Sequence, residues 1–129
     1  MRLLVDTHVL LWAIAEPDKL SARWRAMLES SENEILFSAA SIWELAIKLR
    51  IGRLSLPVGL NDLIQTAKLM ELMELPISAA HAAGVRQLPL YHRDPFDRVL
   101  VAQAIHEPAR LLTADFVLRQ YSDLVEIMG

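Results

Sequence analysis

Cysteine is absent from this chain of 129 residues, and glycine occurs only four times. Without cysteine the chain can form no disulfide framework, thiolate metal site or cysteine nucleophile. The glycines stand at positions 52, 59, 84 and 129, so no glycine-rich loop is available to cradle a phosphate. No apolar run approaches the roughly 18 residues that a membrane span needs, and Asp6 and His8 interrupt the first one. We therefore expect no membrane segment and a cytoplasmic protein.

Positive charge is also scarce. Thirteen basic residues face sixteen acidic ones, for a formal charge of -3 and a pI near 5.8. A protein that holds nucleic acid by its overall field is usually basic, so any such role here must rest on a local site. Hydrophobic residues make up 53% of the chain, which is enough for one sizeable core and excludes intrinsic disorder. The length and the lack of linkers predict a single domain over residues 1–129.

Short apolar runs alternate with helical patterns along the chain, which predicts an α/β fold with a central, mainly parallel sheet. Strands are expected over residues 2–5, 34–37 and 110–113, with further possible strands over 75–77 and 124–127. Helices are expected from Thr7 to before Pro17, from a Ser21 cap to Leu28, and from a Ser38 or Ser41 cap to Ile51, which Gly52 closes. Later helices are expected from Asn61 or Asp62 through Met73, from Ser78 to about Leu88, from an Asp94 cap until Pro108, and from Asp115 to Tyr121.

Acidic residues fall where the predicted strands end. Asp6 directly follows the first strand, and Asp115 comes just after the strand at 110–113. Glu44 lies early in the helix after the second strand, and Asp94 and Asp97 open the helix that leads to the strand at 110–113. Because open parallel sheets build their sites at the carboxyl ends of the strands, we expect these carboxylates to meet in one cleft.

Carboxylates that meet in a cleft repel one another and lose hydration, so the arrangement calls for a counter-ion. Oxygen ligands without cysteine or paired histidine favour Mg²⁺ or Mn²⁺ over Zn²⁺. The chemistry indicated is metal-assisted attack of water on a phosphodiester. Each acid also has a structural interpretation: Asp94 and Asp115 can cap helices, and Glu44 can form a surface pair with Lys48.

Four motifs in order carry a family resemblance. They are Leu4-Val5-Asp6-Thr7-His8, Ser38-Ala39-Ala40-Ser41-Ile42-Trp43-Glu44, His92-Arg93-Asp94-Pro95-Phe96-Asp97-Arg98 and Leu112-Thr113-Ala114-Asp115. Over essentially its whole length the chain resembles the PIN-domain family and, more narrowly, VapC-type toxins of toxin–antitoxin pairs. The resemblance implies a three-layer α/β/α domain, a single-strand ribonuclease dependent on Mg²⁺ or Mn²⁺, a cognate antitoxin partner and a homodimer.

The resemblance also implies roles for individual residues. Asp6 and Asp97 match the direct metal ligands, whereas Glu44 and Asp115 match acids that act through water or on a second ion. Asp97 is chosen over Asp94 because it immediately precedes the helical segment 98–104, as in the family pattern. Supporting residues are Thr7, Asp94 and Thr113, and the candidates for RNA contact are Arg93 and Arg98.

Two other functions fit the same acids. One is a metal-dependent phosphohydrolase of a small phosphoester, although a haloacid-dehalogenase-like enzyme would need an Asp where this chain has His8. The other is a PIN-like module that binds RNA or protein without turning it over.

Overall fold

A five-stranded, entirely parallel sheet forms the centre of the computed structural model, which describes residues 1–127. The strand order is β3-β2-β1-β4-β5. The strands are β1 (Arg2–Val5), β2 (Glu34–Ser38), β3 (Met73–Leu75), β4 (Arg110–Thr113) and β5 (Val125–Ile127). Since β1 is central and is the first strand, the residue that follows it lies at the middle of the carboxyl edge.

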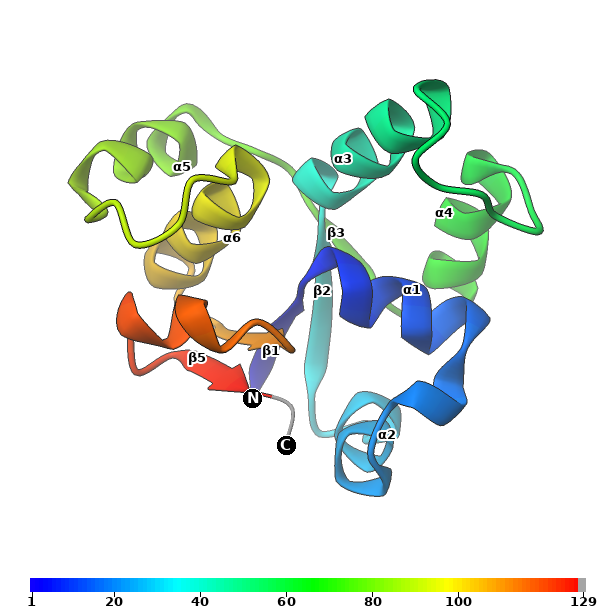
Figure 1. Ribbon diagram of the computed structural model, residues 1–129. Helices are drawn as coiled ribbons and strands as arrows, with labels where there is room; N and C mark the ends of the chain where they lie inside the picture. The colour runs from blue at the N-terminus through cyan, green and yellow to red at the C-terminus, as the bar shows by residue number, and fades with distance from the viewer. Residues whose placement is uncertain (128–129) are drawn as a thin grey trace.

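Helices cover both faces of the sheet, as the α/β prediction required (Figure 1). The α-helices are α1 (Thr7–Ala15), α2 (Ala22–Glu29), α3 (Ala39–Arg50), α4 (Leu60–Leu69), α5 (Ala79–Gly84) and α6 (Pro95–His106). Short 3-10 helices are η1 (Pro17–Lys19), η2 (Val85–Gln87) and η3 (Phe116–Gln120). Within residues 1–127, none of these helices has the length and apolar character to cross a membrane.

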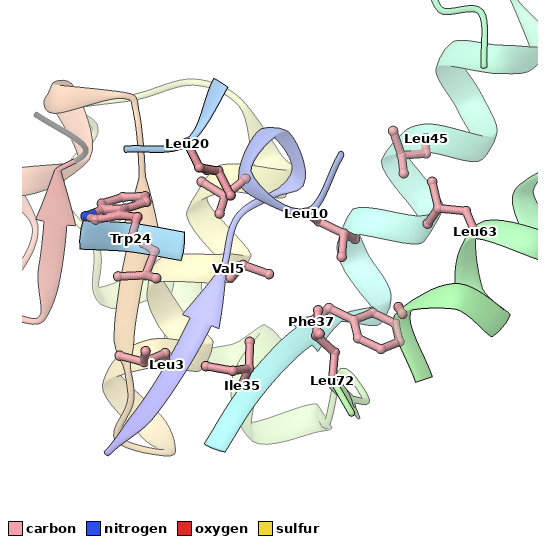
Figure 2. Packing of buried hydrophobic residues seen from close by; sticks show 13 residues of the cluster. Leu3, Val5, Leu10, Leu20, Trp24, Ile35, Phe37, Leu45, Leu63 and Leu72 are labelled. Carbon is pink, nitrogen blue, oxygen red and sulfur yellow. The ribbon is translucent and has the colours of Figure 1, made fainter. Parts of the chain in front are cut away.

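The alternation of side chains along each strand builds two cores. On one face Leu3, Val5, Ile35 and Phe37 pack against helices α1 to α4, and the Trp24 ring is buried in that cluster (Figure 2). On the other face the alternate strand residues Leu4, Leu36 and Leu111 pack mainly against α6. Residues of η3 and Val125 of β5 complete this second cluster. Helix, sheet and helix therefore form three layers, which confirms the expected α/β/α architecture.

Most element boundaries agree with the sequence, and Ser38 rather than Ser41 caps α3. The prediction of a helix through Met73 is wrong, because α4 ends at Leu69 and Met73 begins β3. The helix stops in a left-handed turn at Glu71 (φ 66°), where Leu72 N–H donates to Ala67 O. Gly52 (φ 75°) ends α3 with the same pattern of hydrogen bonds, and glycine is the usual residue there. Without a glycine at position 71 the sequence carries no such stop signal.

Candidate active site

The acids expected in one cleft do share a pocket of about 130 Å³ at the carboxyl edge of the sheet. Its lining contains all four expected site acids and Asp94, together with neighbouring polar and small residues. The full lining is Asp6, Thr7, His8, Glu44, Lys48, Asp94, Asp97, Ala114 and Asp115. Segments that are far apart in the sequence thus bring their carboxylates together, as the strand-end argument predicted.

Asp6 is held at the centre of this edge by donors on both sides. Its Oδ1 accepts the backbone N–H of Val9 at 2.8 Å, which caps α1, and its Oδ2 accepts the hydroxyl of Thr113. The side chain is 5% exposed, and this burial raises the pKa of Asp6, an effect that the two hydrogen bonds oppose. Thr113 therefore links β4 to the carboxylate that follows β1.

Glu44 is buried, with 4% of its surface exposed, and both of its oxygens have partners. The Thr7 hydroxyl donates to Oε1 at 2.7 Å, and the Lys48 ammonium, one helical turn later, pairs with Oε2. Thr7 also lies 3.0 Å from the hydroxyl of Ser41. The Glu44–Lys48 pair is therefore part of the pocket and not a solvated surface pair, and the Thr7 hydroxyl holds the Glu44 carboxylate in place.

Asp97 carries a strongly perturbed carboxyl group. Burial, followed by the nearby carboxylates of Asp94 and Asp6, raises the pKa of Asp97 to about 7, against an ordinary value of 3.8. Asp94 caps α6, with Oδ1 accepting the backbone N–H groups of Phe96 and Asp97 at 2.8 and 3.4 Å. Within residues 1–127 Asp94 forms no ion pair with Arg98, although the two stand one helical turn apart. An ionised Asp97 is thus unfavourable here unless a cation shares the pocket.

Asp115 faces Asp97 across the pocket, and His92 lies between them. His92 Nε2 is 3.0 Å from Asp115 Oδ2 and 3.5 Å from Asp97 Oδ2. Asp115 Oδ1 accepts the backbone N–H of Val117 and caps η3, while Asp115 N–H donates to the Thr113 hydroxyl at 3.0 Å. Thr113 therefore supports two of the four acids.

The two arginines expected to contact RNA differ in their surroundings. Arg93 is exposed, with no hydrogen bond or ion pair to any residue of the 1–127 segment. The Arg98 guanidinium instead forms hydrogen bonds within the protein. It donates to the Tyr121 hydroxyl and to four backbone carbonyls, those of Val85, Leu88, Pro89 and His92. These bonds correct the interpretation of Arg98, which holds the 85–92 segment in place.

Two lining residues, Lys48 and His8, and the adjacent His92 were not among the predicted site residues. Lys48 was interpreted as half of a surface pair, although its place four residues after Glu44 puts it on the same helix face. His8 follows Thr7 in the first motif and is exposed at the pocket. His92 could be suspected from its motif, but no local spacing indicated that it reaches Asp115.

The donor set of the pocket suits a hard divalent cation. Asp6, Glu44, Asp97 and Asp115 all present carboxylate oxygens, which are the ligands that Mg²⁺ and Mn²⁺ prefer. The raised pKa values of Asp6 and Asp97 show that the carboxylates are poorly compensated by the protein alone. Asp97 and Asp115 each offer an oxygen within a group of potential ligand atoms that spans less than 4.8 Å.

A larger hollow of about 430 Å³ lies elsewhere, on the face covered by α1, η1 and α2. Its lining is mixed and largely apolar, and contains none of the four acids. The smaller acidic pocket, where the titratable groups converge, is therefore the candidate active site.

Fold and pocket together define an α/β/α domain with an acidic site at the carboxyl edge of a parallel sheet. The family model "PIN domain" matches residues 3–124, so this chain belongs to the PIN-domain family, as its motifs predicted. Ribonuclease VapC22 of Mycobacterium tuberculosis (strain ATCC 25618 / H37Rv) is 34% identical over 119 residues, which are 92% of this chain and 90% of that protein. This relative confirms the resemblance to VapC-type members.

Two solved structures share the fold. The crystal structure of VapBC2 from Rickettsia felis, bound to a DNA fragment from the promoter, matches with a TM-score of 0.72 at 17% identity and covers 100% of both chains. The crystal structure of FitAcB from Neisseria gonorrhoeae matches with a TM-score of 0.60 at 21% identity, covering 98% of this chain and 96% of that one. At these identities the likeness concerns the fold alone.

Proposed function

We propose that this protein is an endoribonuclease that depends on Mg²⁺ or Mn²⁺ and acts as the toxin of a toxin–antitoxin pair. The observation that carries the proposal is the pocket in which Asp6, Glu44, Asp97 and Asp115 meet. Burial, followed by neighbouring carboxylates, raises the pKa of Asp97 to about 7, and a hard cation in the pocket would supply the missing counter-charge. Similarity to Ribonuclease VapC22 supports RNA as the substrate.

In this proposal Asp6 and Asp97 hold the cation directly, while Glu44 and Asp115 hold water around it. A bound divalent cation supplies a lowered pKa for a coordinated water and neutralises charge on the phosphodiester. Thr113 fixes Asp6, and Thr7 and Lys48 fix Glu44, so these acids meet the substrate without rearrangement.

Because the chain has a formal charge of -3, it offers no general attraction for RNA. Outside the pocket, only a few basic side chains can therefore bind the substrate. Arg93 precedes the pocket residue Asp94 and is exposed, so its guanidinium is available for a phosphate. We assign Arg93 to substrate binding. Arg98 supports the segment that carries Arg93.

The partner in this proposal is a cognate antitoxin. Two solved structures that share the fold are those of VapBC2 and FitAcB, and we take them as support for a protein partner of this chain. An acidic pocket open to RNA is also open to an arginine, whose guanidinium pairs with carboxylates. We propose that the antitoxin inserts such a side chain among Asp6, Glu44 and Asp97. The test measures the affinity of the partner encoded by the adjacent gene for the wild type and for an Asp6→Ala, Asp97→Ala double variant. Equal affinities would contradict this mode of inhibition.

A homodimer completes the proposal, and α3 offers a surface for it. Trp43 and Ile47 on α3 and Ile51 at its C-terminal cap stand at four-residue intervals and are 59%, 39% and 57% exposed. The rings of Trp43 and of Phe96 from α6 pack edge to face, with centroids 5.0 Å apart. Analytical ultracentrifugation of the wild type and of a Trp43→Glu, Ile47→Glu variant tests this surface: a dimer that persists in the variant would place the interface elsewhere.

The test of the activity is cleavage of a single-stranded RNA with EDTA and with Mn²⁺. We expect cleavage by the wild type only with Mn²⁺ and none by Asp97→Asn, since a carboxamide is a poor ligand for the cation. Asp62→Asn is the matched control, because Asp62 is exposed in the first turn of α4, away from the pocket. Hydrolysis of bis(4-nitrophenyl) phosphate without RNA cleavage would favour the small-phosphoester alternative, and no turnover of either would favour a binding module.

A further inference from the structure

We propose that His92 is a positioning residue: its Nε2 acts only as a hydrogen-bond donor, which turns Asp115 into the acidic pocket, and the ring does not ligate the cation. The inference rests on the metal site of the proposed function. By distance alone His92 could be a metal ligand, because His92, Asp97 and Asp115 each offer one potential ligand atom and these atoms lie within 4.8 Å of one another.

The tautomer of His92 follows from the hydrogen bond at its inner nitrogen. Asp94 N–H donates to His92 Nδ1 at 3.0 Å, so Nδ1 presents its lone pair and carries no proton. A neutral imidazole has one donor and one acceptor nitrogen, and the proton is therefore on Nε2. That N–H points at Asp115 Oδ2, 3.0 Å away, with Asp97 Oδ2 at 3.5 Å.

A nitrogen that carries a proton has no lone pair for a metal. For His92 Nε2 to ligate, the ring would have to become an imidazolate or give up the hydrogen bond from Asp94 N–H. The cap at the start of α6 thus converts a potential nitrogen ligand into a donor. Of the group His92, Asp97 and Asp115, only carboxylate oxygens then remain for a cation, and oxygen ligands favour hard ions over Zn²⁺.

The position of the ring is fixed by the segment that carries it. His92 N–H donates to the Tyr121 hydroxyl at 2.8 Å, and Arg98 donates to the carbonyl of His92 at 3.4 Å. Arg98 also donates to the same Tyr121 hydroxyl at 3.1 Å. Backbone and ring of His92 are therefore held from α6 and from the turn after η3.

Asp115 depends on this donor for one of its oxygens. Oδ1 is occupied by the Val117 N–H, whereas in residues 1–127 the only hydrogen-bond donor at Oδ2 is His92 Nε2. Since the Asp115 side chain is 37% exposed, Oδ2 would otherwise be free to seek water outside the pocket. The oxygen keeps a second lone pair, which can hold a metal-bound water.

The test compares His92→Gln with His92→Leu, because the glutamine amide nitrogen stands as many bonds from Cα as Nε2 and can donate in its place. We expect His92→Leu to weaken Mn²⁺ binding by calorimetry at least tenfold, as loss of an outer partner typically does, and His92→Gln to stay within about threefold of wild type. Gln65→Leu is a control on the exposed face of α4, away from the pocket, and should bind Mn²⁺ as wild type does.

Nitrogen NMR of the wild-type ring gives a second readout that needs no variant. We expect the proton on Nε2 both in EDTA and with saturating Mg²⁺. A ring that loses this proton on Mg²⁺ binding, equal losses of Mn²⁺ affinity in both His92 variants, or no loss in His92→Leu would each overturn the inference. An inactive wild type that still binds Mn²⁺ would overturn the ribonuclease proposal and leave the role of His92 standing. A wild type that binds no divalent cation would overturn both.

Discussion

Replacing Asp97 by Asn should make the metal-free protein more stable. At pH 7.5 the wild-type carboxylate is ionised among Asp94, Asp6 and Glu44, in a pocket that raises its pKa to about 7 from 3.8. A tenfold change in a protonation equilibrium corresponds to about 1.4 kcal/mol, so a pKa raised this far corresponds to about 4 kcal/mol of lost stability. Because the side chain is 20% exposed and asparagine forgoes the attraction to His92, we expect a gain of about 2–4 kcal/mol for Asp97→Asn.

The gain should depend on pH in a defined direction. A pKa that is higher in the folded than in the unfolded state means that the folded protein binds the proton more tightly. The stability due to this proton is fully present below pH 4 and is lost as the pH rises through 7, the range set by the two pKa values. Asp97→Asn and wild type should therefore be close at pH 4 and diverge towards pH 7.5.

Urea unfolding in EDTA at several pH values measures this difference. Mn²⁺ at about 100 times its Kd should add about 2.7 kcal/mol to the wild type and much less to Asp97→Asn. Asp62→Asn, the surface control, should remain within about 0.5 kcal/mol of wild type at every pH. If Asp97→Asn were less stable than wild type in EDTA at pH 7.5, Asp97 would have a stabilising partner in the protein and the reasoning would be refuted.

Three further substitutions test other contacts, each by urea unfolding. Glu71→Gly should raise the free energy of unfolding by about 1 kcal/mol, because glycine removes the cost of the left-handed turn after α4, and Glu71→Ala should not. Arg98→Ala should lower it by about 2 kcal/mol through lost hydrogen bonds to the 85–92 segment, whereas Arg93→Ala should leave stability unchanged and weaken RNA binding. Thr113→Val should cost about 1–3 kcal/mol and weaken Mn²⁺ binding, because it removes the hydroxyl donor to the buried Asp6; equal Mn²⁺ affinities would contradict the role given to Thr113.

The central fold and the convergence of acids could be predicted because their signals are local. A run such as Leu3-Leu4-Val5 is apolar on both faces, which only a covered parallel strand requires, and Asp6 ends it. Once the strands are parallel, their carboxyl ends share one edge, and every acid just past a strand is brought there. The resemblance to the PIN-domain family, which the family match confirms, implied the same residues.

What the sequence did not reveal depends on partners distant in the chain or on missing signals. Arg98 was expected to meet RNA because a cationic side chain beside a site is the usual phosphate contact, yet its partners lie up to 23 residues away, at Tyr121. His92 likewise meets Asp115 across 23 residues. Glu71 takes a conformation that sequence patterns assign to glycine, so the end of α4 was placed too late. For Arg98 and His92 the deciding contacts are distant in the chain, whereas at Glu71 the local signal is missing.

The structural and the metal-binding interpretations of these acids are not alternatives, because several side chains satisfy both. Asp6, Asp94 and Asp115 each cap a helix with Oδ1 and also line the pocket. A helix that starts directly after a parallel strand exposes its first N–H groups at the carboxyl edge of the sheet, so a capping carboxylate there necessarily faces the site. Capping fixes one oxygen and leaves the other for a proton, a donor or a cation. An Asp→Asn change therefore keeps the capping oxygen and removes the charge, whereas Asp→Ala removes both, and only the first separates the chemistry of the pocket from the stability of the fold.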